Sequence, residues 1–109
     1  MKIDRQYFDN ATFGEKKIYT FEKVEDHIGA YENRNTGDAV YFELDTDERI
    51  GFIGQSDNRH NWKAYYNATC SYGWDGKKNT KKELVKKLCT RADYRTAYAL
   101  LMEEYKRRK

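Results

Sequence analysis

Residues 39–55 read AVYFELDTDERIGFIGQ, and this stretch decides the fold. Two runs rich in β-branched and aromatic residues, 39–44 and 49–55, flank the acidic segment Asp45-Thr46-Asp47-Glu48. Such runs on either side of a short polar segment are typical of two antiparallel strands joined by a tight turn. The stretch therefore predicts a β-hairpin in the middle of the chain.

Further strands are predicted on both sides of this hairpin. Upstream, residues 17–24 form a β-rich run, and Ile28, Ala30 and Glu32 continue the pattern between a break at 25–27 and the turn formers of 33–38. Downstream, a strand is expected between residues 61 and 71, where alternate residues share one side and face the core: Trp62, Ala64, Tyr66, Ala68 and Cys70. Tyr65 and Thr69 then face outward.

Residues 1–16 show no clear hydrophobic period. We expect an irregular segment or a short strand there, because neither helical nor strand spacing is sustained. Its only candidate core anchors are Tyr7, Phe8 and Phe13.

The last third of the chain is predicted to be helical. Thr80-Lys81-Lys82-Glu83 has the spacing of a capping box, and Leu84, Val85 and Leu88 follow as an apolar face. A second series has the spacing of an amphipathic helix: Tyr94, Ala97, Tyr98, Leu101 and Tyr105. The two faces differ by roughly 120° around one helix axis, which predicts a break at 89–93 and two helices.

These elements predict an α+β fold made of one domain over residues 1–109. The expected architecture is an antiparallel β-meander of four or five strands, followed by two C-terminal α-helices packed on one face. Charged residues make up 36% of the chain and the mean hydropathy is −1.11, but the aromatic share of 16% argues against disorder. No apolar run is long enough for a membrane span and Met1-Lys2-Ile3-Asp4 does not resemble a signal peptide, so we expect a cytoplasmic protein without membrane contact.

Several chemistries have no support in the sequence. Cys70, Cys89, His27 and His60 lack the short ligand spacing of a zinc site, and no nucleophile lies beside a base and an orienting group. We therefore expect a protein that is not an enzyme and that binds no metal or other cofactor. The oligomeric state is left open.

Charge is divided unevenly along the chain. Residues 1–58 carry 7 basic and 13 acidic side chains, a formal charge of −6, whereas residues 59–109 carry 14 and 5, a formal charge of +9. A basic surface in the second half would attract nucleic acid, provided that folding does not interleave the halves.

The second half also alternates aromatic and cationic residues. Rings that stack on bases and cations that neutralise phosphates are the two components of nucleic-acid contact. Lysines ahead of the predicted helix would lie at its positive end, where an anion is favoured. We therefore predict binding to nucleic acid or a ribonucleoprotein through Arg59, Trp62, Lys63, Tyr65, Trp74, Lys77, Lys78, Lys81 and Lys82. The alternative interpretation is that the lysines are merely solvated and the rings belong to the core.

A second functional class uses the acidic half. Phages and mobile elements encode small lysine- and tyrosine-rich inhibitors of host nuclease defences, anti-CRISPR or anti-restriction in kind, and this chain could act in that way through protein–protein binding. The acidic face would be made by Glu22, Glu25, Asp26, Asp38, Glu43, Asp45, Asp47 and Glu48, presented to a basic host protein.

Overall fold

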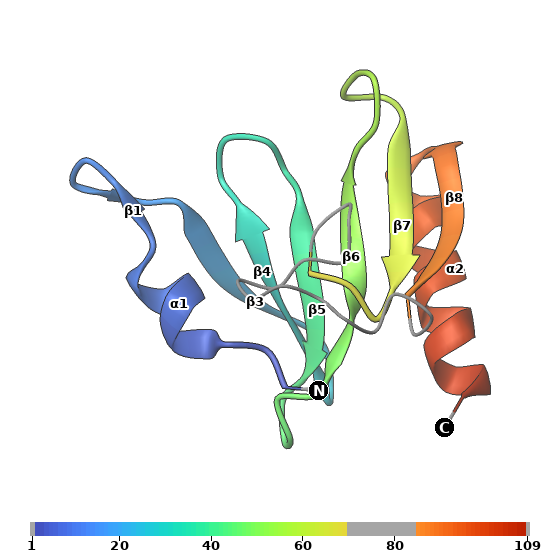
Figure 1. The fold of residues 1–109 in the computed structure, drawn as a ribbon, viewed down its shortest axis with the longest axis horizontal. Helices are drawn as coiled ribbons and strands as arrows, with labels where there is room; N and C mark the ends of the chain where they lie inside the picture. Colours follow the sequence, from blue (N-terminus) through green and yellow to red (C-terminus); the bar gives the residue numbers. More distant parts are fainter. Residues whose placement is uncertain (1, 70–84, 109) are drawn as a thin grey trace.

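A computed structural model describes residues 2–69 and 85–108 of the chain. Its centre is a six-stranded antiparallel sheet in which every strand pairs with its neighbours in sequence, the order β3-β4-β5-β6-β7-β8 (Figure 1). The strands are β3 (Tyr19–Glu25), β4 (Ile28–Asn33), β5 (Ala39–Glu43), β6 (Arg49–Gln55), β7 (Trp62–Tyr66) and β8 (Lys86–Ala92). The predicted α+β class and antiparallel meander are confirmed, with six strands in place of four or five.

The β5–β6 hairpin forms where the sequence predicts it. The backbone N–H of Glu43 donates to the oxygen of Glu48 at 2.9 Å, and the N–H of Glu48 donates to the hydroxyl of Thr46 at 3.1 Å. Asp47 has a φ of 61° in this turn, a left-handed conformation that Asp tolerates better than most residues.

The predicted helix after residue 83 is wrong over the residues described. Residues Lys86–Ala92 form β8, which pairs antiparallel with β7 and adds the sixth strand. Val85, just before β8, packs against one face of the sheet, and Leu88 packs against the other. These residues have helical spacing in the sequence, but here they belong to a strand whose two faces each meet a layer of apolar residues. The Thr80–Glu83 capping box and Leu84 lie outside the described residues.

The second predicted helix is confirmed as α2 (Tyr94–Arg107). Asp93 is the N-cap of α2. Its carboxylate accepts a hydrogen bond from the backbone N–H of Thr96 at 2.7 Å and so satisfies one of the free N–H groups of the first turn. Within the described residues, α2 is the C-terminal helix and packs on β6, β7 and β8, so the expected pair of helices is reduced to one.

Both faces of the sheet are covered. On the α2 side, Leu101 and Met102 of the helix pack on buried strand residues that include Tyr41, Ile53 and Ala64. The opposite side packs under the N-terminal segment and includes Ile3, Phe8, Tyr31, Val40, Phe42, Phe52 and Ala68. Tyr65 points to this second layer and is half-buried there, so it does not lie fully outward as predicted.

The N-terminal segment is more ordered than the sequence indicates. It forms the helix α1 (Arg5–Asn10), in which the carboxylate of Asp4 accepts from the N–H of Tyr7 at 3.1 Å, and a hairpin of β1 (Thr12–Phe13) and β2 (Lys16–Lys17). Phe8 is buried as expected. Tyr7 and Phe13 are exposed, so the prediction that they anchor the core is wrong. In the described part of the chain, neither helix has the length and apolar character needed to cross a membrane.

Candidate binding cleft between the helix and the edge strand

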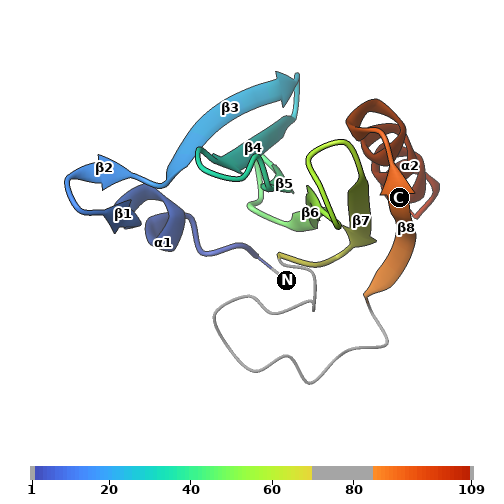
Figure 2. The ribbon, with the colours of Figure 1, turned by 90° about the horizontal axis from the view of Figure 1, so that it is seen from above.

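The helix α2 lies beside β7 and β8, at the other end of the sheet from the edge strand β3 (Figure 2). A cleft on the α2 side of the sheet is lined by residues of both α2 and β3. The helix packs mainly on β6, β7 and β8. Ile28 and Ala30 of β4 are buried in the same cluster as Leu101, so the open part of this face lies along β3 and at Glu32 of β4.

Glu22 of β3 pairs with Ala30 of β4, and Ala30 pairs with Tyr41 of β5. Because paired residues of neighbouring strands point to the same side of a sheet, these three side chains share this face. The resulting cavity has a volume of ≈ 800 Å³.

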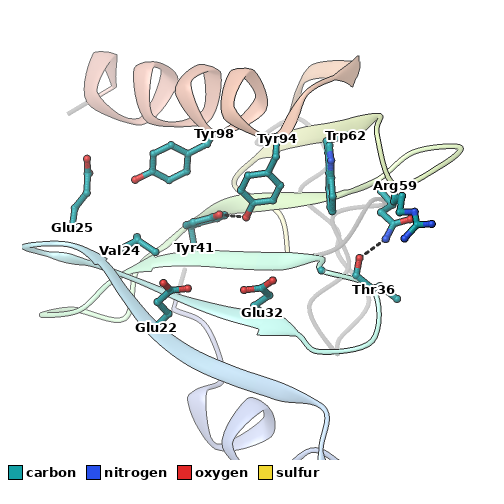
Figure 3. A pocket seen from close by; sticks show the side chains of 12 residues that line it. Glu22, Val24, Glu25, Glu32, Thr36, Tyr41, Arg59, Trp62, Tyr94 and Tyr98 are labelled. Carbon is teal, nitrogen blue, oxygen red and sulfur yellow. Dashed lines mark hydrogen bonds between the residues drawn. The ribbon is translucent and has the colours of Figure 1, made fainter.

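Aromatic side chains form the helix side and the floor of the cleft (Figure 3). Tyr94 and Tyr98 project from the first turns of α2, and Trp62 from β7. The Trp62 and Tyr94 rings meet edge to face with centroids 4.9 Å apart, and the Tyr41 and Tyr98 rings lie 5.5 Å apart. A short hydrogen bond joins the hydroxyls of Tyr41 and Tyr94, which holds the floor to the helix.

Carboxylates form the opposite side. Glu22 and Glu25 of β3 and Glu32 of β4 are exposed and point toward the tyrosines across the cavity (Figure 3). No Lys or Arg of residues 2–69 and 85–108 forms an ion pair with any of the three. Arg59 lines the cleft at its other end, beyond Trp62. The β3 side of the cleft is therefore strongly acidic.

The tyrosine hydroxyls of the cleft stay protonated at neutral pH. Burial, followed by the neighbouring Tyr94 hydroxyl, raises the pKa of Tyr41 far above its ordinary value. Burial also raises the pKa of Tyr94, to which the charges of Glu32 and Glu22 add, and burial together with Glu25 raises the pKa of Tyr98. The carboxylates thus act on the aromatic side electrostatically, and the rings remain neutral.

A second cavity of ≈ 570 Å³ extends the cleft along β3 toward the C-terminal end of α2. Glu25 lines both cavities, and Asp26, His27 and Tyr105 line the second. Nδ1 of His27 lies 3.4 Å from Oδ2 of Asp45, and both side chains are exposed. The two cavities share Glu25 in their lining, and together they are called the groove.

Neutral aromatic faces opposite carboxylates favour a cationic ligand. The rings attract a cation through their quadrupole, and the carboxylates attract it through charge. Among the described residues, no group of three or more His, Cys, Asp or Glu is arranged to hold a metal ion.

The predicted nucleic-acid contacts are divided between two faces of the sheet. Trp62 and Arg59 line the acidic cleft. Lys63 and Tyr65 alternate with Trp62 along β7 and face the other way, where Nζ of Lys87 lies 6.0 Å from the centroid of the Tyr65 ring. The remaining predicted contacts lie outside the described residues: Trp74, Lys77, Lys78, Lys81 and Lys82.

The predicted acidic face is also divided. Glu22 and Glu25 line the cleft, and Asp26 lines its extension. Asp38 instead accepts from the backbone N–H of Gln55 at 2.9 Å. The rest lie at the end of β5 and in the β5–β6 turn: Glu43, Asp45, Asp47 and Glu48.

Sequence reasoning missed Glu32, and it placed the tyrosines of α2 on the apolar face of the helix, where they pack against the core but where Tyr94 and Tyr98 also line the cleft. Glu32 shares the strand side of Ile28 and Ala30, so it is an acidic residue on an otherwise apolar side. A carboxylate in such a position needs water, a partner or a ligand, and this was the available signal. No comparable signal in the sequence marks Tyr94 and Tyr98 as cleft residues, because a ring at helical spacing is equally suited to packing in the core and to lining a cleft.

The chain has no significant match among protein-family models, curated proteins or solved structures.

Proposed function

We propose that the protein is a non-enzymatic binding protein that holds a basic segment of a partner protein in the cleft between β3 and α2. The observation that carries this proposal is the arrangement of Glu22, Glu25 and Glu32 opposite the rings of Tyr94 and Tyr98 across an open cavity. A Lys or Arg side chain entering this space would lie over a ring face while its charge meets a carboxylate.

The energetics favour a side chain of a larger partner over a free cation. An exposed cation–π contact contributes ~0.5 to 1 kcal/mol and an exposed ion pair contributes a similar amount. One such pair gives little affinity, but several basic residues of one chain can use the groove together. The length of the groove, from Arg59 past Glu25 to Tyr105, suits that mode of binding.

Proteins that bind nucleic acid are the partners of matching chemistry, because their active surfaces are lined with Lys and Arg. If the acidic cleft held these Lys and Arg side chains, the partner could not use them to bind nucleic acid. This supports an inhibitor of a host nuclease defence, of the kind that phages and mobile elements encode, over an enzyme.

The test measures binding of a fluorescein-labelled oligoarginine peptide by anisotropy. We expect Glu22→Lys and Glu32→Lys, singly, to weaken binding at least about threefold each, with a further loss in the double variant. Glu15→Lys makes the same charge change on the exposed hairpin, away from the cleft, and is the matched control. Equal losses in Glu15→Lys and Glu32→Lys would mean that net charge, and not the cleft, determines binding.

Nucleic-acid binding by the opposite face is a second candidate. It is favoured by Lys63 and Tyr65 on one face of β7, with Lys87 opposite Tyr65 on β8. We expect Lys63→Glu with Lys87→Glu to weaken nucleic-acid binding and reduce its salt dependence, as we expect for Lys81→Glu with Lys82→Glu. An affinity that does not vary with salt in the wild type would exclude this candidate.

A further inference from the structure

The β1–β2 hairpin projects from the body of the protein beside α1 (Figure 2). Gly14 begins its two-residue connection with a φ of 65°, the conformation that a tight hairpin turn requires and that glycine adopts without strain. Two backbone bonds hold the base of the hairpin: the N–H of Ile18 donates to the oxygen of Ala11 at 3.1 Å, and the N–H of Arg34 donates to the oxygen of Ile18 at 2.8 Å.

The hairpin and the adjoining β4–β5 turn together combine an exposed ring with three cations. Phe13 is 78% exposed, the highest value among the large apolar side chains described. Lys16 is paired directly with Phe13 across the hairpin, and Lys17 follows on β2. The backbone bond to Ile18 brings the β4–β5 turn, with Arg34, to the same place.

A depression of ≈ 200 Å³ lies between these groups. It is lined by Phe13, Lys16, Lys17, Ile18, Arg34 and Asn35, a set with three cations and no carboxylate. Within the described ranges, none of the three cations forms an ion pair. Glu15, in the turn of the hairpin, does not line the depression, so an anion placed there would meet three cations next to a flat apolar surface.

We propose that this hairpin site binds single-stranded nucleic acid, with a base stacked on Phe13 and the adjacent phosphate held by Lys16, Lys17 and Arg34. An exposed ring beside a cationic groove is the common arrangement for single strands, because every base has a face that can stack. A duplex offers no such face. An acidic protein surface would use the cations but would gain less from a protruding phenyl ring.

The hairpin site is independent of the cleft and of the Lys63–Tyr65–Lys87 surface. Its ligand is anionic, whereas the cleft takes a cation, and its residues belong to β1, β2 and the β4–β5 turn. Substitutions in the hairpin site, in the cleft and on the Lys63–Tyr65–Lys87 surface therefore test three separate binding sites.

The experiment measures anisotropy of a fluorescein-labelled oligothymidylate of about 12 nucleotides, with inorganic polyphosphate as the competitor that has charge but no base. We expect Phe13→Ala to weaken oligonucleotide binding about tenfold and to leave polyphosphate binding unchanged. Lys16→Ala with Lys17→Ala should weaken both and lower the slope of log K against log salt by about 1 to 2. Lys23→Ala, an exposed lysine on β3, is the matched control.

Two results would overturn the proposal. If Phe13→Ala binds the oligonucleotide as the wild type does, the site is a charged surface without base stacking. If the lysine double variant matches Lys23→Ala, the hairpin does not contact the phosphates. Because all the substituted side chains are exposed, a thermal melt of each variant should coincide with that of the wild type.

Discussion

Nζ of Lys86, on the edge strand β8, lies 3.3 Å from Oε1 of Glu104 on α2. Glu104 is only 5% exposed, although it is charged. Arg107 donates to both of its carboxylate oxygens at 2.6 and 2.8 Å, and Arg108 also donates to it. One carboxylate thus joins the last turn of the helix to the edge of the sheet.

Glu104→Gln should lower the melting temperature at neutral pH, because three cations lose a charged acceptor in a partly desolvated position. Hydrogen bonds from Arg108, Arg107 and Lys86 hold the pKa of Glu104 at about 2, below its ordinary value of 4.5. A lowered folded-state pKa adds stability above pH 4.5, and this stability is lost as the pH falls toward 2. The gap between wild type and variant should therefore close over that interval in melts followed by circular dichroism. Glu103→Gln, an exposed neighbour, is the control, and a gap constant in pH would contradict the assignment.

Tyr94→Phe should destabilise the protein by ~1 to 3 kcal/mol, because it leaves the buried hydroxyl of Tyr41 without its partner. The double variant with Tyr41→Phe should lose less than the sum of the two single losses, since no orphaned hydroxyl remains. Urea denaturation of the four proteins gives the coupling directly. Tyr98→Phe removes a hydroxyl that forms no such bond with any residue of 2–69 or 85–108, and it should cost less than Tyr94→Phe. Strict additivity of the two losses would contradict the pairing.

The protein should lose stability as the pH rises above about 10. Burial raises the pKa of Tyr41, Tyr94, Tyr98 and Tyr31 above 10.0, so the folded state holds protons that the unfolded chain releases. Their contribution to the free energy of unfolding is complete at a pH below the tyrosine pKa of the unfolded chain, and it declines as the pH rises above that value. Tyrosinate absorbance at about pH 11 should show fewer ionised tyrosines in the folded protein than in denaturant. Equal ionisation in the two states would contradict the burial of these hydroxyls.

The strands predicted from sequence are those with continuous apolar runs, β5 and β6, and those with β-rich or alternating patterns, β3, β4 and β7. The β5 and β6 runs are buried on both faces, and their turn is polar, so local pattern and tertiary environment agree. The prediction failed at β8, because Leu84, Val85 and Leu88 have helical spacing, and because β8 pairs with residues of β7 that are 20 (Tyr66 with Lys86) to 30 (Trp62 with Ala92) positions away in sequence. Long-range pairing overrode local spacing there. In α1, six residues are too few to show a period, and Asp4 was the one usable signal.

The cleft could be predicted only in part. The sequence identified Glu22 and Glu25 as members of an acidic face, and the structure brings them to one cavity. It could not indicate that α2 stops short of β3, because the reach of a helix across a sheet depends on packing between distant residues. The assignment of Trp62 and Lys63 to one surface is a different error, because strand alternation, which the sequence already shows, places them on opposite faces.

Gly51→Ala should destabilise the protein by ~1 to 3 kcal/mol, because α2 crosses β6 in contact with this glycine. A Cβ added there would lie 2.5 Å from Cδ1 of Leu101 and 2.5 Å from the backbone oxygen of Tyr65. Leu101→Ala removes the first obstacle but not the second, so the double variant should remain less stable than Leu101→Ala alone. Displacement of the helix would also move Tyr94 and Tyr98, so Gly51→Ala should weaken oligoarginine binding although it changes no cleft side chain. Wild-type stability of Gly51→Ala in urea would contradict the close approach of helix and strand that shapes the cleft.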